Sequence, residues 1–339
     1  MNPTVDGPAS VSTGRQFWGS GRWAAERMLE ALAAGRELSP AVLRTNASLG
    51  INDWKAYDTA IVQAAALRIR AVQDLITAGL VTPLANAMGT TVLEYQTLSD
   101  MDPAIVSMDG MARSENDRPD FGSAGLPLPI THKDFFINIR TLSASRKRGE
   151  GLDVTMARVA GRKVGEEIER QLIIGGKTFA GLPIYGYTTH PNRNTGSFGT
   201  NGNWVQAAKT GADILADVFT MVAALEADKY FGPYVLYVSR NAASKLEGDY
   251  STNRSGTIRS RLLETAYLSD VRYLDLLPNN TVILIQLTED VVTLVNGEQP
   301  QTVQWDVNGG FGVNMKAFAI QIPLVRADAA GNSGIYHMS

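Results

Sequence analysis

Between residues 52 and 78, apolar residues recur with the spacing of one face of a helix. Asp53 stands at the cap position, and Gly79 follows the last apolar residue. The pattern predicts one long helix there, preceded by a short helix at 23–34. The first residues are rich in Gly, Pro, Ser and Thr, which predicts an extended arm.

The clearest amphipathic pattern covers 152–174. Asp153 stands at the cap, and Gly175 and Gly176 are predicted to end the helix, because Gly is favoured just past a helix C-terminus. The apolar side is formed by Leu152, Met156, Val159, Val164, Ile168 and Leu172. The opposite side, which we expect to be exposed, carries Arg158, Arg162, Lys163, Glu166, Glu167, Glu169 and Arg170.

Two strand-like segments, 91–98 and 135–140, enclose a polar connection at 108–126. This arrangement predicts a projecting hairpin. A two-stranded ribbon is only marginally stable in water by itself, so it needs a surface to rest on. The ribbon between Val92 and Arg140 has little of its own subunit to pack on, and we therefore expect another copy of the chain to supply that surface.

Downstream, helical and strand patterns alternate. A helix is predicted at 213–227 and a buried strand at 234–238. Further helices are predicted at 240–246 and 258–265, and further strands at 271–277, 281–287, 290–295, 302–305 and 313–325. The segment 188–202 is rich in Gly, Asn and Thr and predicts a flexible loop.

Composition narrows the class of protein. The 339 residues, 44% of them hydrophobic, suffice for one large or two smaller domains. The absence of Cys excludes disulfides and thiolate metal ligands and is typical of proteins made in the cytoplasm. No apolar run approaches the ~18 residues of a membrane-spanning helix. The N-terminus lacks the pattern of a secretory signal.

The net charge of −3, from 31 basic and 34 acidic residues, argues against duplex DNA binding as the main task. Such proteins usually carry a strong positive excess that neutralises phosphates. One basic cluster, formed by Arg146, Lys147 and Arg148, precedes the 152–174 helix. It has three open interpretations: it faces nucleic acid, an acidic patch of a neighbouring subunit, or solvent.

One local motif resembles the end of a phosphate-binding loop, Gly175-Gly176-Lys177-Thr178. That loop requires an earlier glycine where Gln171 stands, and it follows a strand rather than a helix. The end of a helix is the favoured interpretation. No other sequence motif indicates an enzyme. The Gly-x-Ser-x-Gly motif of serine hydrolases is absent, and the carboxylates are scattered along the chain.

Metal and cofactor sites are not expected either. His132, His190 and His337 lie far apart in the sequence, without the spacing of metal ligands. A second glycine pattern, Gly196, Gly199 and Gly202, has no strand leading into it and no acidic residue placed for a ribose hydroxyl, which favours a flexible loop.

The order of these elements resembles the Hong Kong 97 capsid fold, which is shared by the major capsid proteins of tailed phages and by encapsulin nanocompartments. The resemblance covers roughly Thr91 to Arg326 and rests on an ordered set of stretches. They are 126–135 (returning strand of the extended loop), 143–176 (linker and spine helix), Gly181-Leu182-Pro183, 230–238 (axial-domain strand) and 311–326 (final peripheral-domain strand).

The resemblance implies an α+β, Hong Kong 97-like capsid fold with an N-terminal arm, an extended hairpin loop, a peripheral domain with a long spine helix, and an axial domain. The segments would be 1–90 (arm and N-terminal helices), 91–150 (extended loop), 151–205 (spine helix and glycine-rich loop), 206–310 (mainly axial domain) and 311–339 (C-terminal strand of the peripheral domain and tail).

The implied function is that of a major capsid protein and not of an enzyme. Copies would form hexamers and pentamers of an icosahedral shell around double-stranded DNA, assembled in the host cytoplasm by apolar burial spread over many contacts. The expected partners are further copies of the chain, with a separate scaffolding protein, a decoration protein and a portal as further candidates. Packaged DNA would be contacted non-specifically, with no cofactor and no membrane.

Charged residues of the extended loop and spine helix are expected to contact neighbouring subunits, although exposed ion pairs contribute little singly. The loop set is Arg113, Glu115, Asp117, Arg118 and Asp120, and the helix set is Arg158, Arg162, Glu166 and Glu169. Some relatives crosslink subunits through a lysine of the extended loop. The only lysine of this loop, Lys133, lies near its base, so no crosslink is expected. No fused, cleaved scaffold is expected either, because the N-terminal helices look integral.

Two alternatives stay open. An encapsulin shell enclosing an enzyme would share the fold, but the long hairpin and the 188–202 insertion favour a phage capsid. An oligomeric nucleotide-binding enzyme, acting through Gly176-Lys177-Thr178, is the alternative from a different class.

Overall fold

The computed structural model describes residues 51–66, 69–98, 106, 108, 121–138, 140, 154–251, 254–307, 312–328 and 330–339. The chain divides into two compact units. The smaller unit takes in Met1–Lys55, Asp134–Asp153 and Val303–Lys316, and the larger unit takes in Ala56–Lys133, Val154–Thr302 and Ala317–Ser339. The features below belong to the larger unit unless the smaller one is named.

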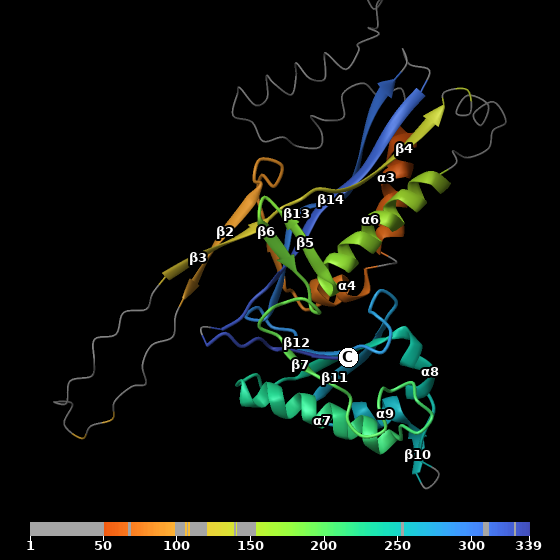
Figure 1. Cartoon of the computed structure of the whole chain (residues 1–339). Coiled ribbons are helices and arrows are strands. Elements are labelled where there is room, and N and C mark those ends of the chain that lie inside the picture. Colours follow the sequence, from red (N-terminus) through yellow and green to blue (C-terminus); the bar gives the residue numbers. More distant parts are fainter. Residues whose placement is uncertain are drawn as a thin grey trace, which may run out of the picture. The chain divides into compact units, whose positions relative to one another are not determined.

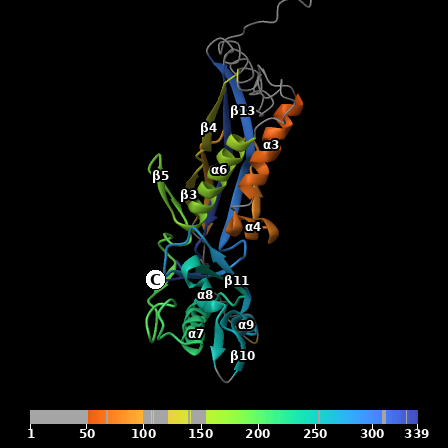
Figure 2. The same ribbon diagram turned by 90° about the vertical axis from the view of Figure 1, so that its right-hand side faces the viewer.

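Helices and strands alternate along the described chain (Figures 1 and 2). The helices are α3 (Ile51–Ala66), α4 (Arg70–Thr77), α6 (Thr155–Ile173), α7 (Gly211–Ala227), the 3-10 turn η1 (Arg240–Ala242), α8 (Ala243–Leu246) and α9 (Ile258–Leu263). The strands are β1 (Val81–Pro83), β2 (Val92–Leu98), β3 (Phe121–Pro127), β4 (Thr131–Asn138), β5 (Gly175–Phe179), β6 (Leu182–Tyr185), β7 (Asn194–Gly196), β8 (Tyr234–Ser239), β9 (Asp249–Ser251), β10 (Arg254–Thr257), β11 (Leu268–Leu274), β12 (Val282–Gln286), β13 (Val292–Val307), β14 (Gly312–Val325) and β15 (Ile335–Met338).

A five-stranded sheet has the order β11-β8-β12-β15-β7. β11 runs parallel to β8 and β7 parallel to β15, whereas β12 is antiparallel to both of its neighbours. β11 and β12, which are predicted as strands joined by a turn, are therefore separated by β8. Every residue of β8 is buried, as expected for a continuous apolar run covered on both faces.

The two faces of β8 meet different partners. On one face, Leu236 and Val238 belong to the same apolar core as Val218 and Met221 of α7. On the other face, Tyr237 stacks against Tyr187 with ring centroids 6.1 Å apart. α7 and α9 lie on the same side of the sheet in Figure 1. The predicted buried strand and the predicted helix at 213–227 are both confirmed.

A four-stranded sheet has the order β1-β13-β14-β4, with β1 parallel to β13. Its core includes Val295 of β13 and Ile320, Ile322 and Leu324 of β14. Leu126 at the end of β3 packs into the same core, which joins the base of the β2–β3 ribbon to this sheet.

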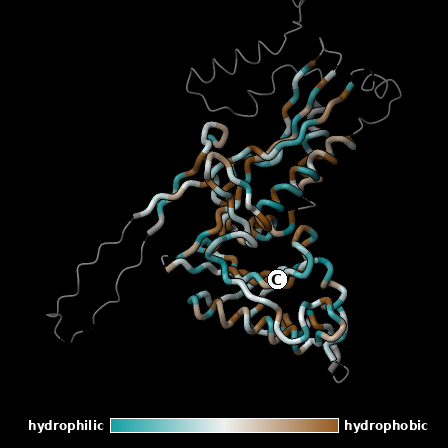
Figure 3. The backbone as a smooth tube through the Cα atoms, in the orientation of Figure 1, coloured by the Kyte–Doolittle hydropathy of each residue, from teal (hydrophilic) through white to brown (hydrophobic). Residues whose placement is uncertain are grey.

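α6 and α3 lie side by side and approach through glycines (Figure 2). A Cβ built on Gly161 would lie 2.5 Å from the carbonyl oxygen of Ile61, and one on Gly165 would lie 2.7 Å from that of Ala65. Real Cβ contacts are not that short, so any larger side chain would push the two helices apart. Figure 3 shows hydrophobic and hydrophilic positions alternating along α6.

The structure corrects which residues form the buried side of α6. Met156 and Val159 are 55% and 44% exposed, although the sequence pattern places them on the apolar side. The side against α3 contains Gly161 and Gly165 instead, and the small residue Ala157 is also buried. Close helix packing selects small side chains there, so hydrophobicity alone is a poor guide to that side.

The long helix predicted for 52–78 is broken in two. The chain is already helical at Ile51, so Asp53 lies inside α3 and is not its cap. Ile69 leaves helical geometry with a ψ of 77°, and α4 begins at Arg70. The first amides of α4 donate to a side chain of α6, as described below, which replaces the hydrogen bonds that a continuous helix would make.

The ribbon has different strands from those predicted. β2 pairs antiparallel with β3, in the register Val92 with Pro127 through Leu98 with Phe121, and not with 135–140. β4 instead joins the four-stranded sheet beside β14. β3 contains two glycines and a proline, so its sequence has little strand signal.

The base of the ribbon packs on its own chain. Leu126 and Leu128 are buried, and Leu93 and Tyr95 pack against the same apolar core. The expectation that this ribbon lacks a surface of its own subunit is therefore wrong for its base. Figure 1 shows β2 and β3 running outward from there as a two-stranded ribbon.

The smaller unit contains the ends of β4, β13 and β14. Lys316 lies 3.6 Å from the carboxylate of Asp134 and 5.8 Å from the centroid of the Trp305 ring. Phe136 covers Gly312, where an added Cβ would collide with its ring. In the parts of both units that the structure describes, no helix combines the length and apolar character needed to cross a bilayer.

Candidate functional site

A groove of about 510 Å³ lies between α6, the start of β4 and the end of β5. Apolar side chains that remain partly exposed contribute to it, namely Ile130 (44%), Val159 (44%) and Phe179 (38%). Its charged lining consists of Lys133, Lys163, Glu167 and Lys177, together with His132. The groove therefore combines an apolar lining with a positively charged border.

Three of the four predicted spine-helix residues lie on the accessible side of α6. Arg158 is exposed, and Arg162 lies 3.7 Å from Glu166 one turn away. Glu166 also accepts a hydrogen bond from Lys163 at 2.8 Å. These pairs lie within one helix and leave its cations accessible, so their role in contacts between subunits stays a prediction.

Glu169 is a correction to that set. Its side chain is 2% exposed and accepts hydrogen bonds from the backbone amides of Ala71 (2.8 Å) and Val72 (3.2 Å) at the start of α4. Burial raises the pKa of Glu169 to about 7, although the two amides oppose that shift. Glu169 thus holds α4 within its own chain and is not available to a neighbouring subunit.

The other predicted site residues lie outside the described part of the chain. They are the loop set Arg113, Glu115, Asp117, Arg118 and Asp120, and the basic cluster Arg146, Lys147 and Arg148. Within 99–120, the segment that contains the loop set, Val106 and Met108 are described, and both side chains are almost completely exposed.

The glycine motif at the end of α6 is confirmed as a helix end. Gly175 and Gly176 adopt positive φ angles of 61° and 81° and lead into β5, not into a helix. Lys177 lies 2.5 Å from the carboxylate of Glu167. The motif therefore lacks the helix N-terminus that a phosphate-binding loop requires.

The histidines do not form a metal-binding group among the described residues, although Arg193 donates hydrogen bonds to both the carbonyl of His190 and the ring of His337. His132 is exposed, whereas His190 is buried, and burial together with the nearby Arg193 lowers the pKa of His190 to about 4. His337 receives a hydrogen bond from Arg193 at 3.3 Å. No group of three metal-ligating side chains occurs among the described residues.

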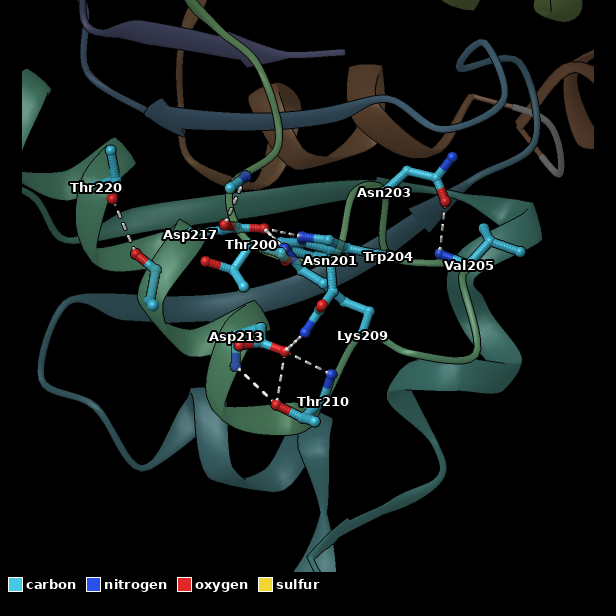
Figure 4. A network of polar contacts seen from close by, with 12 residues as sticks. Thr200, Asn201, Asn203, Trp204, Val205, Lys209, Thr210, Asp213, Asp217 and Thr220 are labelled. Atoms are coloured by element: carbon cyan, nitrogen blue, oxygen red, sulfur yellow. Dashed lines mark hydrogen bonds and ion pairs between the residues drawn. The ribbon is translucent and has the colours of Figure 1, made fainter.

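A buried ion pair that sequence reasoning missed anchors the loop before α7 (Figure 4). Lys209 is fully buried, with its Nζ 2.7 Å from the carboxylate of Asp217 and 2.8 Å from the carbonyl of Thr200. Asp217 also accepts hydrogen bonds from the indole of Trp204 (2.8 Å) and the amide of Gly199 (3.1 Å).

This network is structural. Lys209 has no solvent-accessible surface, so no substrate can reach its amine. The end of the segment predicted as a flexible loop is held in place through Gly199, and Asn194–Gly196 pairs as β7. The available signal was Asp217 itself, a carboxylate between Ile214 and Val218 on the buried side of α7.

The N-terminus of α7 offers a test of local stability. Thr210 and Asp213 form a reciprocal capping box, and Asn201 donates to Asp213 at 2.9 Å (Figure 4). We expect Thr210→Ala to lower the free energy of unfolding by about 1 kcal/mol, since one amide loses its acceptor. Urea denaturation measures it, with Thr220→Ala, in the exposed middle of α7, as the matched control. Equal losses in the two variants would contradict the cap.

The chain matches one known protein family. The sequence model of that family, described as a family of unknown function (DUF6260), matches residues 45–338. No curated protein matches the chain.

Solved structures are similar over most of the chain at low sequence identity. A virus-like particle from Pyrococcus furiosus is 15% identical with a TM-score of 0.61, covering 85% of this chain and 99% of that one. The capsid of Myoviridae phage XM1 is 10% identical with a TM-score of 0.58, covering 78% and 90%. The capsid of an empty GTA particle is 13% identical with a TM-score of 0.54, covering 78% and 89%. These matches confirm the predicted α+β, Hong Kong 97-like fold.

Proposed function

Because the chain belongs to the family of unknown function DUF6260 and has a Hong Kong 97-like fold, we propose that it is a shell subunit, the major capsid protein of a tailed bacteriophage. Copies would form hexamers and pentamers of an icosahedral shell around double-stranded DNA, without catalysis. The observation that carries the proposal is the similarity in fold to particle and capsid structures over 78% to 85% of this chain. The segment division from 1–90 to 311–339 is part of the proposal.

Charge supports a contact between the extended loop of one copy and α6 of the next. Residues 99–120 contain six carboxylates and two arginines, a net charge of −4. The groove and the outward side of α6 have the opposite balance, with six cations and two carboxylates. These residues are Lys133, Arg158, Arg162, Lys163, Arg170, Lys177, Glu166 and Glu167. Complementary charge of this kind steers association and fixes its register.

Apolar surface supports the same contact. Val106 and Met108, in the acidic segment, are 96% and 106% exposed within one chain. The groove offers Ile130, Val159 and Phe179 as a partly exposed apolar lining. Burying such side chains against one another in the shell would add the hydrophobic stabilisation that ion pairs at a surface lack.

The proposed partners follow from the shell. They are further copies of the chain, with a scaffolding protein, a decoration protein and a portal as additional candidates, and packaged DNA contacted non-specifically. The location would be the virion capsid after assembly in the host cytoplasm. Within this proposal, Arg113, Glu115, Asp117, Arg118 and Asp120 remain candidates for contacts between subunits. The cluster of Arg146, Lys147 and Arg148 remains a candidate inner-face or interface patch.

The test is assembly of charge-reversed variants, measured by electron microscopy and sedimentation of the full chain with its viral partners. We expect Lys133→Glu/Lys163→Glu to reduce closed shells at least about tenfold, because two cations of the groove become repulsive to the loop. The control Lys229→Glu/Arg240→Glu makes the same change in net charge on other elements. In the described part of the chain, Lys163 and Arg240 each have an ion-pair partner, so each double variant removes one such pair.

Two outcomes would count against the proposal at different levels. If the unaltered chain forms neither shells nor rings with its viral partners, the shell function is wrong. If shells form but both double variants lose them equally, the groove is not the specific contact.

A second candidate is a nanocompartment of the encapsulin type. The virus-like particle from Pyrococcus furiosus is matched over 99% of its own length, which supports a shell of that kind as well. The contents of purified shells distinguish the two candidates. Genome-length DNA supports the phage capsid, whereas a protein cargo without DNA supports the nanocompartment.

A further inference from the structure

A pocket of about 270 Å³, separate from the groove at α6, lies beside the C-terminal half of α7. Four of its residues have the spacing of one helix face, and a fifth comes from the turn before β11. They are Phe219, Val222, Ala223, Glu226 and Tyr267. The rings of Phe219 and Tyr267 lie edge to face with centroids 6.2 Å apart, yet they are 43% and 40% exposed. Two large aromatic side chains therefore remain half in water in the single chain.

Glu226 adds a negative charge beside these rings. Its side chain is partly buried, and no cation lies within ion-pairing distance of it in the part of the chain that the structure describes. Aromatic ring faces and a carboxylate both attract a cation. A lysine or arginine side chain matches this lining, because its apolar stem packs on rings while its charged end reaches the carboxylate. A purely apolar occupant would instead bury Glu226 without a partner, which is costly.

A cation without a carboxylate partner among the described residues lies at the other end of α7. Lys245 of α8 has its Nζ 3.5 Å from the carbonyl of Ala207, shortly before α7 begins. The pocket lies at the start of β8, where the amide of Tyr234 donates to the carbonyl of Tyr267, whereas α8 follows the end of β8 at Ser239. β8 alone spans roughly 17 Å, so Lys245 cannot fill the pocket of its own chain.

We propose that the pocket of Phe219, Glu226 and Tyr267 receives the Lys245 side chain of a neighbouring copy. The proposal rests on the proposed shell function and names a contact within its rings. Because the pocket and the lysine lie at opposite ends of α7, the contact is head to tail, and a repeated head-to-tail contact closes into a ring when its rotation allows. Each copy then gives one lysine and receives one. The rings exclude water from the pair, which strengthens it beyond an exposed ion pair.

Carbodiimide cross-linking of the assembled full chain tests the contact directly. The reagent activates a carboxylate, and an amine in contact with it displaces the activating group and forms an amide bond. We expect mass spectrometry of the products to identify Glu226 joined to Lys245. Since these residues are too far apart within one chain, the product reports a contact between copies. Lys245→Arg keeps the cation but has no amine that can form this bond, so it should assemble normally and give no such product.

A charge swap tests whether assembly depends on the pair. We expect Lys245→Glu to reduce rings and closed shells at least about tenfold in sedimentation, since two carboxylates then meet at the pocket. Glu226→Lys/Lys245→Glu restores opposite charges and should recover assembly to within about threefold of the unaltered chain. Lys229→Glu makes the same change in net charge at an exposed lysine outside the pocket lining and should assemble normally.

An aromatic truncation tests the role of the rings with a matched control. Phe219→Ala should reduce assembly at least about fivefold, because the lysine loses a ring face. Phe231 is more exposed, at 70%, but does not line the pocket, so Phe231→Ala should leave assembly unchanged. Equal losses in the two variants would show that apolar surface in general, and not this pocket, supports the contact.

Two levels of failure can be told apart. If shells form but contain no product joining 226 to 245, or if Lys245→Glu assembles like the unaltered chain, this contact is wrong and the shell function stands. A charge swap as impaired as Lys245→Glu alone would also overturn the pairing. If the unaltered chain forms neither shells nor rings with its viral partners, the shell function fails and the contact fails with it.

Discussion

Replacement of Asp217 with alanine is expected to lower the free energy of unfolding by about 3 to 5 kcal/mol, the largest single effect in this chain. The substitution leaves Lys209 fully buried without a counter-charge, and Trp204 and Gly199 lose their acceptor. Urea denaturation of the unassembled chain, followed by tryptophan fluorescence, measures the loss.

The matched control for Asp217 lies one turn earlier on the same helix. Asp213→Ala also removes a carboxylate, but one that is partly exposed and belongs to the capping box at the start of α7, so a much smaller loss is expected. The double variant Lys209→Met/Asp217→Leu removes both buried charges and should be clearly more stable than Asp217→Ala. If Asp217→Ala costs no more than Asp213→Ala, the ion pair does not contribute as described.

The second large effect is expected where α3 meets α6. Gly→Ala in a helix ordinarily stabilises it by up to about 1 kcal/mol. At Gly161 and Gly165 the new methyl groups would collide with the backbone of Ile61 and Ala65, so Gly161→Ala/Gly165→Ala should lower the free energy of unfolding by about 3 kcal/mol.

Thermal or urea unfolding of the Gly161/Gly165 double variant decides the sign of the effect. Arg162→Ala, at a neighbouring accessible position of α6, serves as the control and should change stability by less than about 0.5 kcal/mol. A stabilised double variant would mean that α3 can move away at no cost and that the close approach is incidental.

The elements with strong periodic patterns could be predicted from the sequence. α7, β8 and the end of α6 at Gly175 follow from local signals, namely an amphipathic stripe, a continuous apolar run and a pair of glycines. The ordered set of such elements also predicted the fold, which the structural comparisons confirm.

The missed features depend on contacts that no local pattern encodes. β3 carries almost no strand signal and is a strand because β2 and Leu182 of β6 lie beside it. In the sequence, Glu169 has the pattern of a charged residue on the exposed side of its helix. In the structure it is buried, because two amides of α4 donate hydrogen bonds to it. The sequence shows Asp217 only as a carboxylate among apolar residues of a helix. It does not reveal the ion pair, because the partner Lys209 precedes that helix.

The position of β15 has a consequence for protein synthesis. Ile335–Met338 inserts between β12 and β7, so β7 has no strand partner until the ribosome has made all of the sequence from α7 to β15. Pairing over such a separation is slow, and until then the edges of β12 and β7 are unprotected. A nascent chain therefore cannot complete this sheet before Met338 has been made, and the finished surface of the sheet forms only after that point.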